Sequence, residues 1–185
     1  MNPRERIFTV PNLLSLFRLG LLVPILVFMS QGRTLWALFL MILGVITDFV
    51  DGYIARRWDQ SSDLGRIIDP AVDKINVLVV TFFMVVSPLY SFPLWFFLFI
   101  LFRELVLMAC SSLVIRQKDV VMESNRPGKN SAFAMGMTVI FFLLDLRPYA
   151  WIVLWIAFAL TLYSSYVYFR LFLGRLKSQA VSDSS

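Results

Sequence analysis

Four aspartates in the first half of the chain are unusual because they lie in or beside strongly apolar segments. Asp48 and Asp51 fall near the end of one apolar run, and Asp69 and Asp73 open the next one. An aspartate at membrane depth costs about 2.5 kcal/mol or more unless a partner compensates its charge. Four such residues so close together therefore indicate a function rather than ordinary helix packing.

The spacing of these aspartates suits a metal site. On an α-helix, Asp48 and Asp51 are three residues apart and Asp69 and Asp73 are four apart, so each pair lies on one helix face. Two such pairs on neighbouring helices can converge on one point. Mg²⁺ and Mn²⁺ prefer carboxylate oxygens, and two metals about 3.5–4 Å apart can hold a phosphate during its displacement. The chemistry predicted by these residues is phosphoryl transfer.

Two other roles stay open for the four aspartates. They can form buried ion pairs that hold two helices together, or they can line a proton or cation path through a transporter. Long basic side chains at helix ends extend to lipid headgroups, so we expect those nearest in sequence to lie at the membrane surface. These basic residues are Arg56, Arg57, Arg66 and Lys74. We therefore expect divalent cations, rather than these residues, to hold the carboxylates.

The composition is typical of a multi-pass membrane protein. The chain of 185 residues is 59% hydrophobic and only 16% charged, which excludes an ordinary soluble domain. Its length accommodates six spans of about 20 residues, so we expect an all-α six-helix membrane bundle forming a single domain over residues 1–185. The sequence has no His, so a proton must be taken by a carboxylate, Lys or Tyr. The single Cys110 cannot form a disulfide within the chain.

Apolar runs and turn residues predict where the helices begin and end. Residues 1–12 are expected to form a short interfacial lead-in, with Asn12 as the N-cap of the first helix. The segment Gln31-Gly32-Arg33 is expected to be a tight turn, and residues 174–185 a flexible cytoplasmic tail. The helices are predicted over residues 13–29, 35–56, 69–86, 94–115, 131–144 and 149–173.

The placement of Lys and Arg predicts the orientation in the membrane. Most of the 17 basic residues lie near the two chain ends, around residues 56–74 and in the 116–129 loop. The opposite connections hold only Arg33 and Arg147. The positive-inside rule then puts both termini and the four aspartates on the cytoplasmic side. The net charge of +5 is scattered over short loops, which favours lipid headgroups over nucleic acid as partners.

Residues 48 to 73 follow the pattern D-x2-D-G-x2-A-R-x8-G-x3-D-x3-D, with eight specified residues in 26 positions. This pattern resembles the signature of the CDP-alcohol phosphotransferase family, six-helix membrane enzymes that transfer a substituted phosphate from a CDP-linked lipid to an alcohol and release CMP. The resemblance implies that the four aspartates bind two divalent cations, Mg²⁺ or Mn²⁺. It also implies that Asp73 takes the proton from the attacking hydroxyl and that the protein is a homodimer.

The resemblance further implies a binding site for CDP-diacylglycerol. Gly52 and Ala55 are small enough for the nucleotide to approach the helix backbone closely, although Ala55 also suits simple helix packing. Arg56 is placed to pair with a phosphate. Asn12 and Ser15 resemble another nucleotide-side segment of the family. The residues expected to contact the CDP-lipid are Gly52, Ala55, Arg56, Ser62, Gly65 and Asn12.

Three basic residues in the second half of the chain are candidates for binding a phosphate on the acceptor alcohol. They are Arg103, Arg126 and Lys129, and guanidinium groups and ammonium groups both suit this role. Arg103 is followed by Glu104 within an apolar run. A purely structural role for this pair, linking two helices, stays open beside the role in phosphate binding.

The Arg103-Glu104 and Gly128-Lys129 pairs resemble the bacterial branch of the family whose acceptor is glycerol 3-phosphate, and imply a bacterial cytoplasmic membrane. Ser111 and Ser131 stand near positions where that branch usually carries Arg and Lys. Phosphatidylglycerol, inositol phosphate and serine therefore stay open as acceptors. A small cation transporter is the alternative from another functional class.

Overall fold

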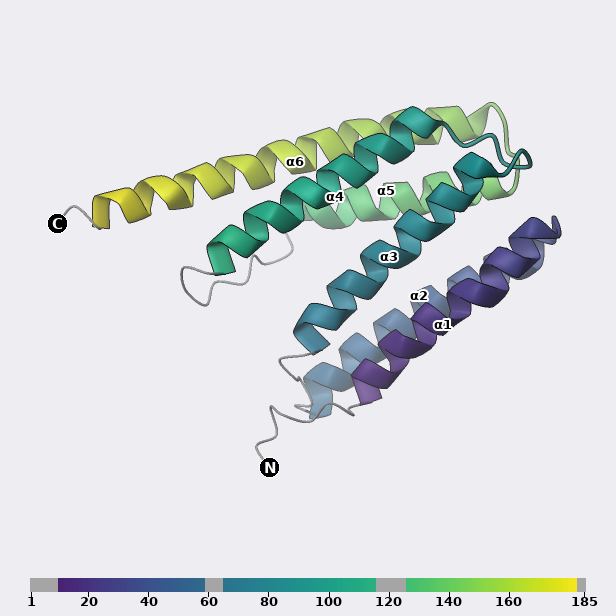
Figure 1. Ribbon diagram of the computed structural model, residues 1–185, viewed down its shortest axis with the longest axis horizontal. Coiled ribbons are helices and arrows are strands. Elements are labelled where there is room, and N and C mark those ends of the chain that lie inside the picture. The colour runs from purple at the N-terminus through teal and green to yellow at the C-terminus, as the bar shows by residue number, and fades with distance from the viewer. Residues whose placement is uncertain (1–9, 59–64, 116–125, 183–185) are drawn as a thin grey trace. The chain divides into compact units, whose positions relative to one another are not determined.

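The structure, a computed structural model, describes the backbone of residues 10–58, 65–115 and 126–182 and the side chains of residues 13–48, 72–108 and 127–171. The described ranges contain six α-helices and no strand, which confirms the expected all-α class. The chain divides into two compact units, Met1–Pro93 and Leu94–Ser185 (Figure 1). The helices are α1 (Val10–Ser30), α2 (Thr34–Trp58), α3 (Gly65–Val86), α4 (Leu94–Ile115), α5 (Arg126–Leu143) and α6 (Tyr149–Ser182).

In the first unit, α1 packs against both α2 and α3 (Figure 1). The side chains of Met29 on α1, Ala37 on α2 and Met84 on α3 are completely buried. Burying a large apolar side chain contributes about 1.5–3 kcal/mol relative to leaving it in water. The three helices are thus held by a shared apolar core that runs along α1.

The turn between α1 and α2 is a Schellman motif. The N–H of Arg33 donates to the carbonyl of Phe28 at 2.9 Å, and the N–H of Gly32 donates to that of Met29 at 3.1 Å. Gly32 has a φ of 68°, which glycine adopts without steric cost. The predicted tight turn is confirmed, and it makes α1 and α2 antiparallel neighbours.

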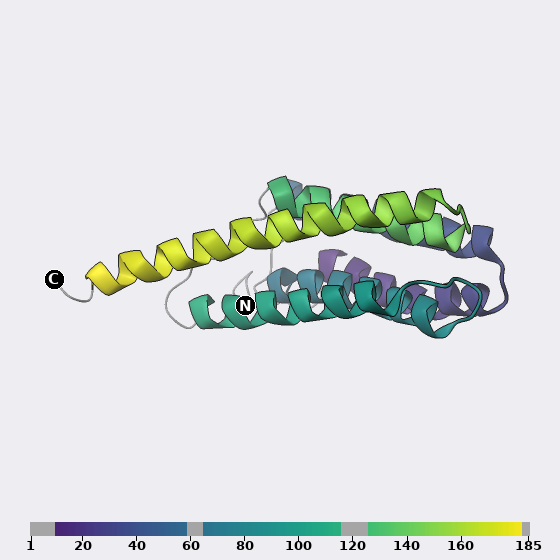
Figure 2. The same cartoon turned by 90° about the horizontal axis from the view of Figure 1, so that it is seen from above.

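In the second unit, α5 packs along α6, and α4 also contacts α6 (Figures 1 and 2). Phe96 of α4, Phe142 of α5 and Leu154 of α6 are almost completely buried. Phe158 of α6 meets Phe99 of α4 edge-to-face, with ring centroids 4.8 Å apart. Aromatic pairs of this kind contribute about 0.5–1.5 kcal/mol beyond their buried area, so they fix the contact between α4 and α6.

Several helix ends differ from the predicted ones. Helix α1 begins at Val10, so Asn12 lies in its first turn and the prediction of Asn12 as N-cap is wrong. Helix α5 begins at Arg126 instead of residue 131. Proline is tolerated in a first helical turn because its missing N–H would have no helical partner there, and both Pro11 and Pro127 occupy such turns.

The other differences are helices that continue into polar sequence. Helix α3 begins at Gly65, four residues before the predicted start, and α6 continues to Ser182, past its predicted end at residue 173. Residues 174–182 therefore continue α6, and the flexibility expected of this tail stays a prediction. Long straight-chain residues such as Arg175, Leu176 and Lys177 favour helix even where the sequence is polar.

Two described helical segments are long and apolar enough to cross a membrane, Leu13–Ser30 and Tyr149–Leu171, and Thr34–Asp48 is a shorter apolar segment. Leu35, Trp36 and Phe39 on α2 each expose more than half of their surface. Large exposed apolar surfaces mark contacts with lipid or with other proteins. These features fit a membrane protein, and the count of six spans stays a prediction.

Candidate active site

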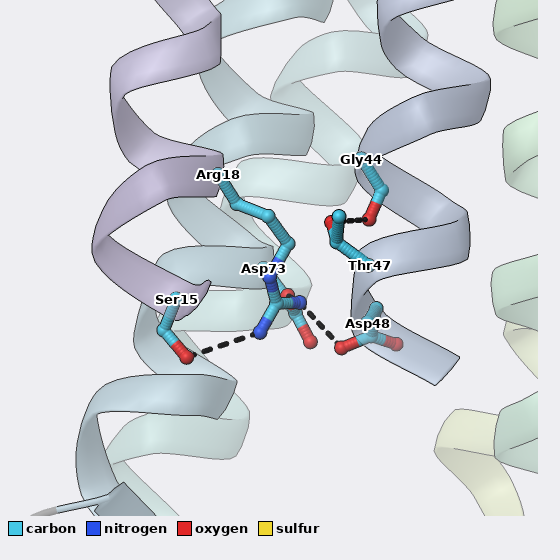
Figure 3. Close-up of polar contacts among 6 residues, drawn as sticks. All are labelled: Ser15, Arg18, Gly44, Thr47, Asp48 and Asp73. Carbon is cyan, nitrogen blue, oxygen red and sulfur yellow. Dashed lines mark hydrogen bonds and ion pairs between the residues drawn. The ribbon is translucent and has the colours of Figure 1, made fainter. Parts of the chain in front are cut away.

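Three helices of the first unit meet at one buried arginine. Arg18 lies on α1, and its Nη1 donates to Oδ1 of Asp48 on α2 and to Oδ1 of Asp73 on α3, the latter at 2.6 Å (Figure 3). The two aspartates are 25 residues apart in sequence (73 minus 48). Two carboxylates from different helices therefore converge on a single cationic nitrogen.

Arg18 is directed inward by its place on α1. Ser15, Arg18, Leu22, Ile25 and Met29 are all buried and recur at intervals of three or four residues, so they form one face of the helix. This face packs against α2 and α3, and an arginine on it must find hydrogen-bond acceptors. Oγ of Ser15 supplies one further acceptor, at 3.1 Å from Nη2 of Arg18.

Exposure differs sharply between the arginine and the two carboxylates. The side chain of Arg18 is 4% exposed, whereas those of Asp48 and Asp73 are 47% and 50% exposed. One positive charge faces two negative charges, which leaves this trio with a net charge of −1. Half-exposed carboxylates with surplus negative charge can accept a further cation from solvent. This donor set fits a hard divalent metal.

The remaining predicted residues of this half lie on the same helices, but their side chains are outside the described set. Asp51 follows Asp48 by three residues on α2, and Asp69 precedes Asp73 by four on α3. The helical backbone thus keeps each pair on one face, as the spacing predicts. Among the side chains that the structure describes, no three Asp, Glu, Cys or His residues gather. Convergence of all four aspartates stays a prediction.

The residues predicted to contact the CDP-lipid are located only by their backbone. Gly52, Ala55 and Arg56 lie in the last two turns of α2, and Gly65 is the first residue of α3. Asn12 lies in the first turn of α1. Ser62 falls outside the described residues. The contacts of these side chains with a nucleotide stay predictions.

Arg18 is the residue that the sequence reasoning missed. The expectation that divalent cations hold the carboxylates considered only the basic residues nearest in sequence as alternatives. In the structure Arg18 pairs with both Asp48 and Asp73, and binding of metal by these aspartates stays a prediction. A signal was present, since an arginine in the middle of an apolar run requires a polar partner inside the bundle. The spacing of residues in the sequence does not show which side chains are the partners of Arg18.

In the second unit, Arg103 links α4 to α6. Its Nη1 pairs with Oε1 of Glu104, its Nε donates to Oγ of Ser165 at 3.3 Å, and its Nη2 lies 3.5 Å from Oγ of Ser164. These contacts support the structural role that the sequence left open. The side chain of Arg103 is partly exposed, at 15%, and its role in acceptor binding stays a prediction.

The first turn of α5 carries the other two candidates for acceptor binding. Lys129 is exposed, whereas the side chain of Arg126 is outside the described set. Ser131 is 3% exposed, and its hydroxyl donates to the carbonyl of Gly128 at 2.9 Å. Ser131 therefore forms a hydrogen bond within the first turns of α5. It stands near the position where the bacterial branch of the family usually carries a Lys.

Comparison with known proteins identifies the family. A sequence profile of the CDP-alcohol phosphatidyltransferase family matches residues 8–163. The chain is 33% identical over 139 residues to a cardiolipin synthase (CMP-forming) of Streptomyces coelicolor, an alignment that covers 70% of this chain and 62% of that protein. It is 40% identical over 116 residues to a CDP-diacylglycerol–glycerol-3-phosphate 3-phosphatidyltransferase of Aquifex aeolicus, covering 59% and 61%.

A protein of the same name from Cereibacter sphaeroides is 37% identical over 105 residues, covering 52% of this chain and 46% of that protein. The chain thus spans less than two thirds of the length of these relatives. The matched region includes α1 to α5 and the first part of α6, residues 149–163. It also contains the aspartates on α2 and α3 and the buried arginine that pairs with two of them. This chain is a member of the CDP-alcohol phosphatidyltransferase family.

Proposed function

We propose that this chain transfers a phosphatidyl group from CDP-diacylglycerol to glycerol 3-phosphate and releases CMP, a step of phospholipid biosynthesis. The observation that supports this most is the convergence of Asp48 and Asp73, from two helices, on one cationic centre. The names of the Aquifex and Cereibacter relatives support the choice of glycerol 3-phosphate. This is the activity of bacterial phosphatidylglycerophosphate synthases.

Two divalent cations, Mg²⁺ or Mn²⁺, are proposed to bind at Asp48, Asp51, Asp69 and Asp73. The half-exposed carboxylates of Asp48 and Asp73 and their surplus negative charge support this assignment. When bound, the cations would neutralise the pyrophosphate of the CDP-lipid and stabilise the charge that develops on the departing CMP.

Asp73 is proposed as the general base. An alcohol hydroxyl is too weak an acid to attack unaided, so a carboxylate within hydrogen-bond reach must accept its proton. The oxygen of the acceptor then forms a bond to the phosphorus of the phosphatidyl group. The bond from this phosphorus to the oxygen shared with CMP breaks, and its electron pair leaves with CMP. The 50% exposure of the Asp73 side chain supports access by the acceptor.

The other site residues are proposed to hold the two substrates. Gly52, Ala55, Arg56, Ser62, Gly65 and Asn12 are assigned to the CDP-lipid, and Arg103, Arg126 and Lys129 to the phosphate of the acceptor. The position of Gly52, Ala55 and Arg56 on α2, within the eight residues after Asp48, supports the first assignment. The exposure of Lys129 supports the second.

Phosphatidylglycerol is the second candidate acceptor. The Streptomyces relative is named as a cardiolipin synthase that forms CMP, and its alignment covers the largest share of this chain among the relatives described above. Serine at positions 111 and 131 also departs from the branch that uses glycerol 3-phosphate. Inositol phosphate and serine have no comparable support. Membership in a family of phosphatidyltransferases favours an enzyme over a small cation transporter.

The protein is proposed to be a homodimer in a bacterial cytoplasmic membrane, with six spans and with both termini and the site on the cytoplasmic side. The bacterial origin of the relatives and the two long apolar helices support the location. The distribution of Lys and Arg supports the orientation. The large exposed apolar side chains support burial in lipid or against a second copy.

An acceptor panel tests the proposed function. Purified protein in detergent is given CDP-diacylglycerol and Mg²⁺ or Mn²⁺, and CMP release is measured with glycerol 3-phosphate, phosphatidylglycerol, inositol phosphate or serine. We expect release with glycerol 3-phosphate and its loss in EDTA. Release only with phosphatidylglycerol would establish the second candidate. No release with any acceptor, in the presence of both metal and lipid, would contradict the proposal.

A further inference from the structure

We propose that Arg18 is a built-in counter-ion of the metal site, which holds Asp48 and Asp73 together before divalent cations bind and competes with those cations for the same carboxylates. The proposal rests on the proposed function in one respect, that these two aspartates are metal ligands. It assigns Arg18 a positioning role, because the residue acts through the carboxylates.

The hydrogen bonds of Arg18 support the competition. Nη1 donates to Oδ1 of both Asp48 and Asp73 (Figure 3). A carboxylate oxygen that binds Mg²⁺ offers the ion a lone pair at about 2.0–2.1 Å. A guanidinium N–H and a metal ion cannot both occupy the position that these two oxygens share. An ion that binds at these two Oδ1 atoms must therefore displace or reorient at least one of these hydrogen bonds.

The burial of Arg18 keeps its charge beside the site even after that change. The side chain is 4% exposed and is anchored on the far side by Oγ of Ser15, 3.1 Å from Nη2. An arginine on a membrane surface can turn away into water, but this one is buried and pairs with side chains of α2 and α3 (Figure 3). Its positive charge then repels the incoming cation at short range, where the interior screens weakly. Arg18 is thus expected to weaken metal binding.

The same contacts stabilise the metal-free protein. Without Arg18, two carboxylates from different helices would lose the positive charge that this arginine places between them, and like charges at close range destabilise the packing of the helices that carry them. A divalent cation would supply the missing charge. The proposal therefore predicts opposite effects of removing Arg18, namely lower stability without metal and tighter binding of metal.

A purely structural arginine would behave differently. If Arg18 only joins three helices, its loss should lower stability equally with and without metal. The distortion of the site should also leave the affinity for metal unchanged or weaker. Affinity for Mn²⁺ is the measurement that separates the two roles, and it needs neither substrate nor turnover.

The experiment compares wild type, Arg18→Met and Arg33→Met as full-length protein in detergent. Mn²⁺ affinity is measured by the loss of the free-ion signal in electron paramagnetic resonance. Thermal stability is measured by unfolding in EDTA and in saturating Mn²⁺. Arg33 is exposed in the α1–α2 turn, so Arg33→Met removes one positive charge away from the site. We expect Arg18→Met to lower the Kd for Mn²⁺ about tenfold, equivalent to about 1.4 kcal/mol, and Arg33→Met to leave it unchanged.

In EDTA, Arg18→Met is expected to melt several degrees below wild type, and saturating Mn²⁺ is expected to remove that deficit. Arg18→Lys keeps the charge but loses the forked donors, so it should bind Mn²⁺ with a Kd between those of wild type and Arg18→Met. If Arg18→Met does not fold without metal, the comparison of Arg18→Lys with wild type decides the question.

Equal or weaker Mn²⁺ binding by the Arg18 variants, beside clear binding by wild type, would overturn the inference and leave the proposed function intact. Absence of Mn²⁺ binding in wild type and in every variant would overturn the metal site of the proposed function, and the inference with it. A tenfold lower Kd in Arg33→Met as well would show that the loss of any positive charge tightens Mn²⁺ binding. That result would overturn the specific role of Arg18 as counter-ion of the metal site.

Discussion

At the scale of the residue, charge balance decides what the first unit can do. Arg18 places one positive charge in a buried position, where it pairs with the half-exposed, negatively charged side chains of Asp48 and Asp73. An isolated buried guanidinium would be very unfavourable, so the two carboxylates satisfy Arg18 as much as it satisfies them. The same two residues are candidates for the chemistry, which means that stability and function share the same atoms.

The role of Asp73 as general base predicts a selective loss of activity. Asp73→Asn keeps the shape of the side chain but cannot accept the hydroxyl proton, so CMP release should fall by about 10²–10⁴-fold. The melting temperature should fall modestly, because the amide oxygen can still accept the hydrogen bond from Arg18 but carries no negative charge. Asp145→Asn is the matched control. Asp145 is exposed, with a φ of 52° that asparagine also tolerates, so activity and stability should match wild type. Retained turnover in Asp73→Asn would remove it as the base.

At the scale of the element, contacts near helix ends join segments that are distant in sequence. The hydroxyl of Tyr90, in the connection after α3, donates to the carbonyl of Met29 near the end of α1 at 2.7 Å. Tyr90 is 2% exposed. In the second unit, Gly128 lets the start of α5 approach Tyr168 of α6 closely. Both contacts join elements distant in sequence, and each can be tested by removing one atom.

Removing the Tyr90 hydroxyl should weaken the first unit. Tyr90→Phe loses the hydrogen bond to Met29, and we expect a loss of about 1 kcal/mol in stability, measured by thermal unfolding in detergent. Tyr163→Phe is the control because Tyr163 is 58% exposed and should melt with wild type. Equal melting temperatures for Tyr90→Phe and wild type would show that the contact contributes nothing.

The same tyrosine predicts a dependence on pH. Burial raises the pKa of Tyr90 above its ordinary value of 10.0. The folded protein therefore keeps the phenol proton at pH values where the unfolded chain releases it. The contribution to stability is fully present below about pH 10 and is lost as the pH rises further. Wild type should lose stability more steeply than Tyr90→Phe above pH 10, and parallel curves would contradict the shift.

The contact between Gly128 and Tyr168 predicts a double-mutant cycle. A Cβ at position 128 would lie 2.9 Å from the phenol oxygen of Tyr168, so Gly128→Ala forces that side chain to move. We expect a cost of about 1 kcal/mol, measured by thermal unfolding. In a Tyr168→Phe background the nearest atom would be a ring carbon at 3.4 Å, and most of the cost should disappear.

Gly136→Ala is the control for this cycle, because nothing lies within 4 Å of a Cβ at that position. There alanine should be neutral or stabilise α5 by up to about 1 kcal/mol through its higher helix propensity. An equal cost of Gly128→Ala with and without the Tyr168 hydroxyl would show that the close contact is not responsible.

At the scale of the whole molecule, the proposed six spans put three helix connections on the outer side of the membrane. Cysteine substitution in a Cys110→Ser background tests this. Cysteines replacing Arg33, Leu89 and Arg147, one in each outer connection, should react with a membrane-impermeant maleimide in intact cells. A cysteine replacing Lys177 should react only after the membrane is opened. Labelling of Lys177→Cys in intact cells would contradict the proposed orientation.

Local chemistry in the sequence determined the class of the protein, the approximate helices and the family. The range of α4 was predicted without error, because Pro93 and a continuous apolar run mark its start and length within the local sequence. The predicted ranges of α3, α5 and α6 each stop several residues short at one end, because polar residues at a helix end do not by themselves stop the helix. The eight fixed residues between Asp48 and Arg56 and between Gly65 and Asp73 were sufficient for the family.

Only the tertiary structure decided which basic residue pairs with Asp48 and Asp73. Arg18 is 30 residues from Asp48 and 55 from Asp73, and nothing in the local spacing connects them. Their contact depends on which face of α1 packs against α2 and α3, a choice made by the buried apolar side chains along the whole helix. Periodicity identifies the residues of a helix face, but the partner of that face is determined only when the helices assemble.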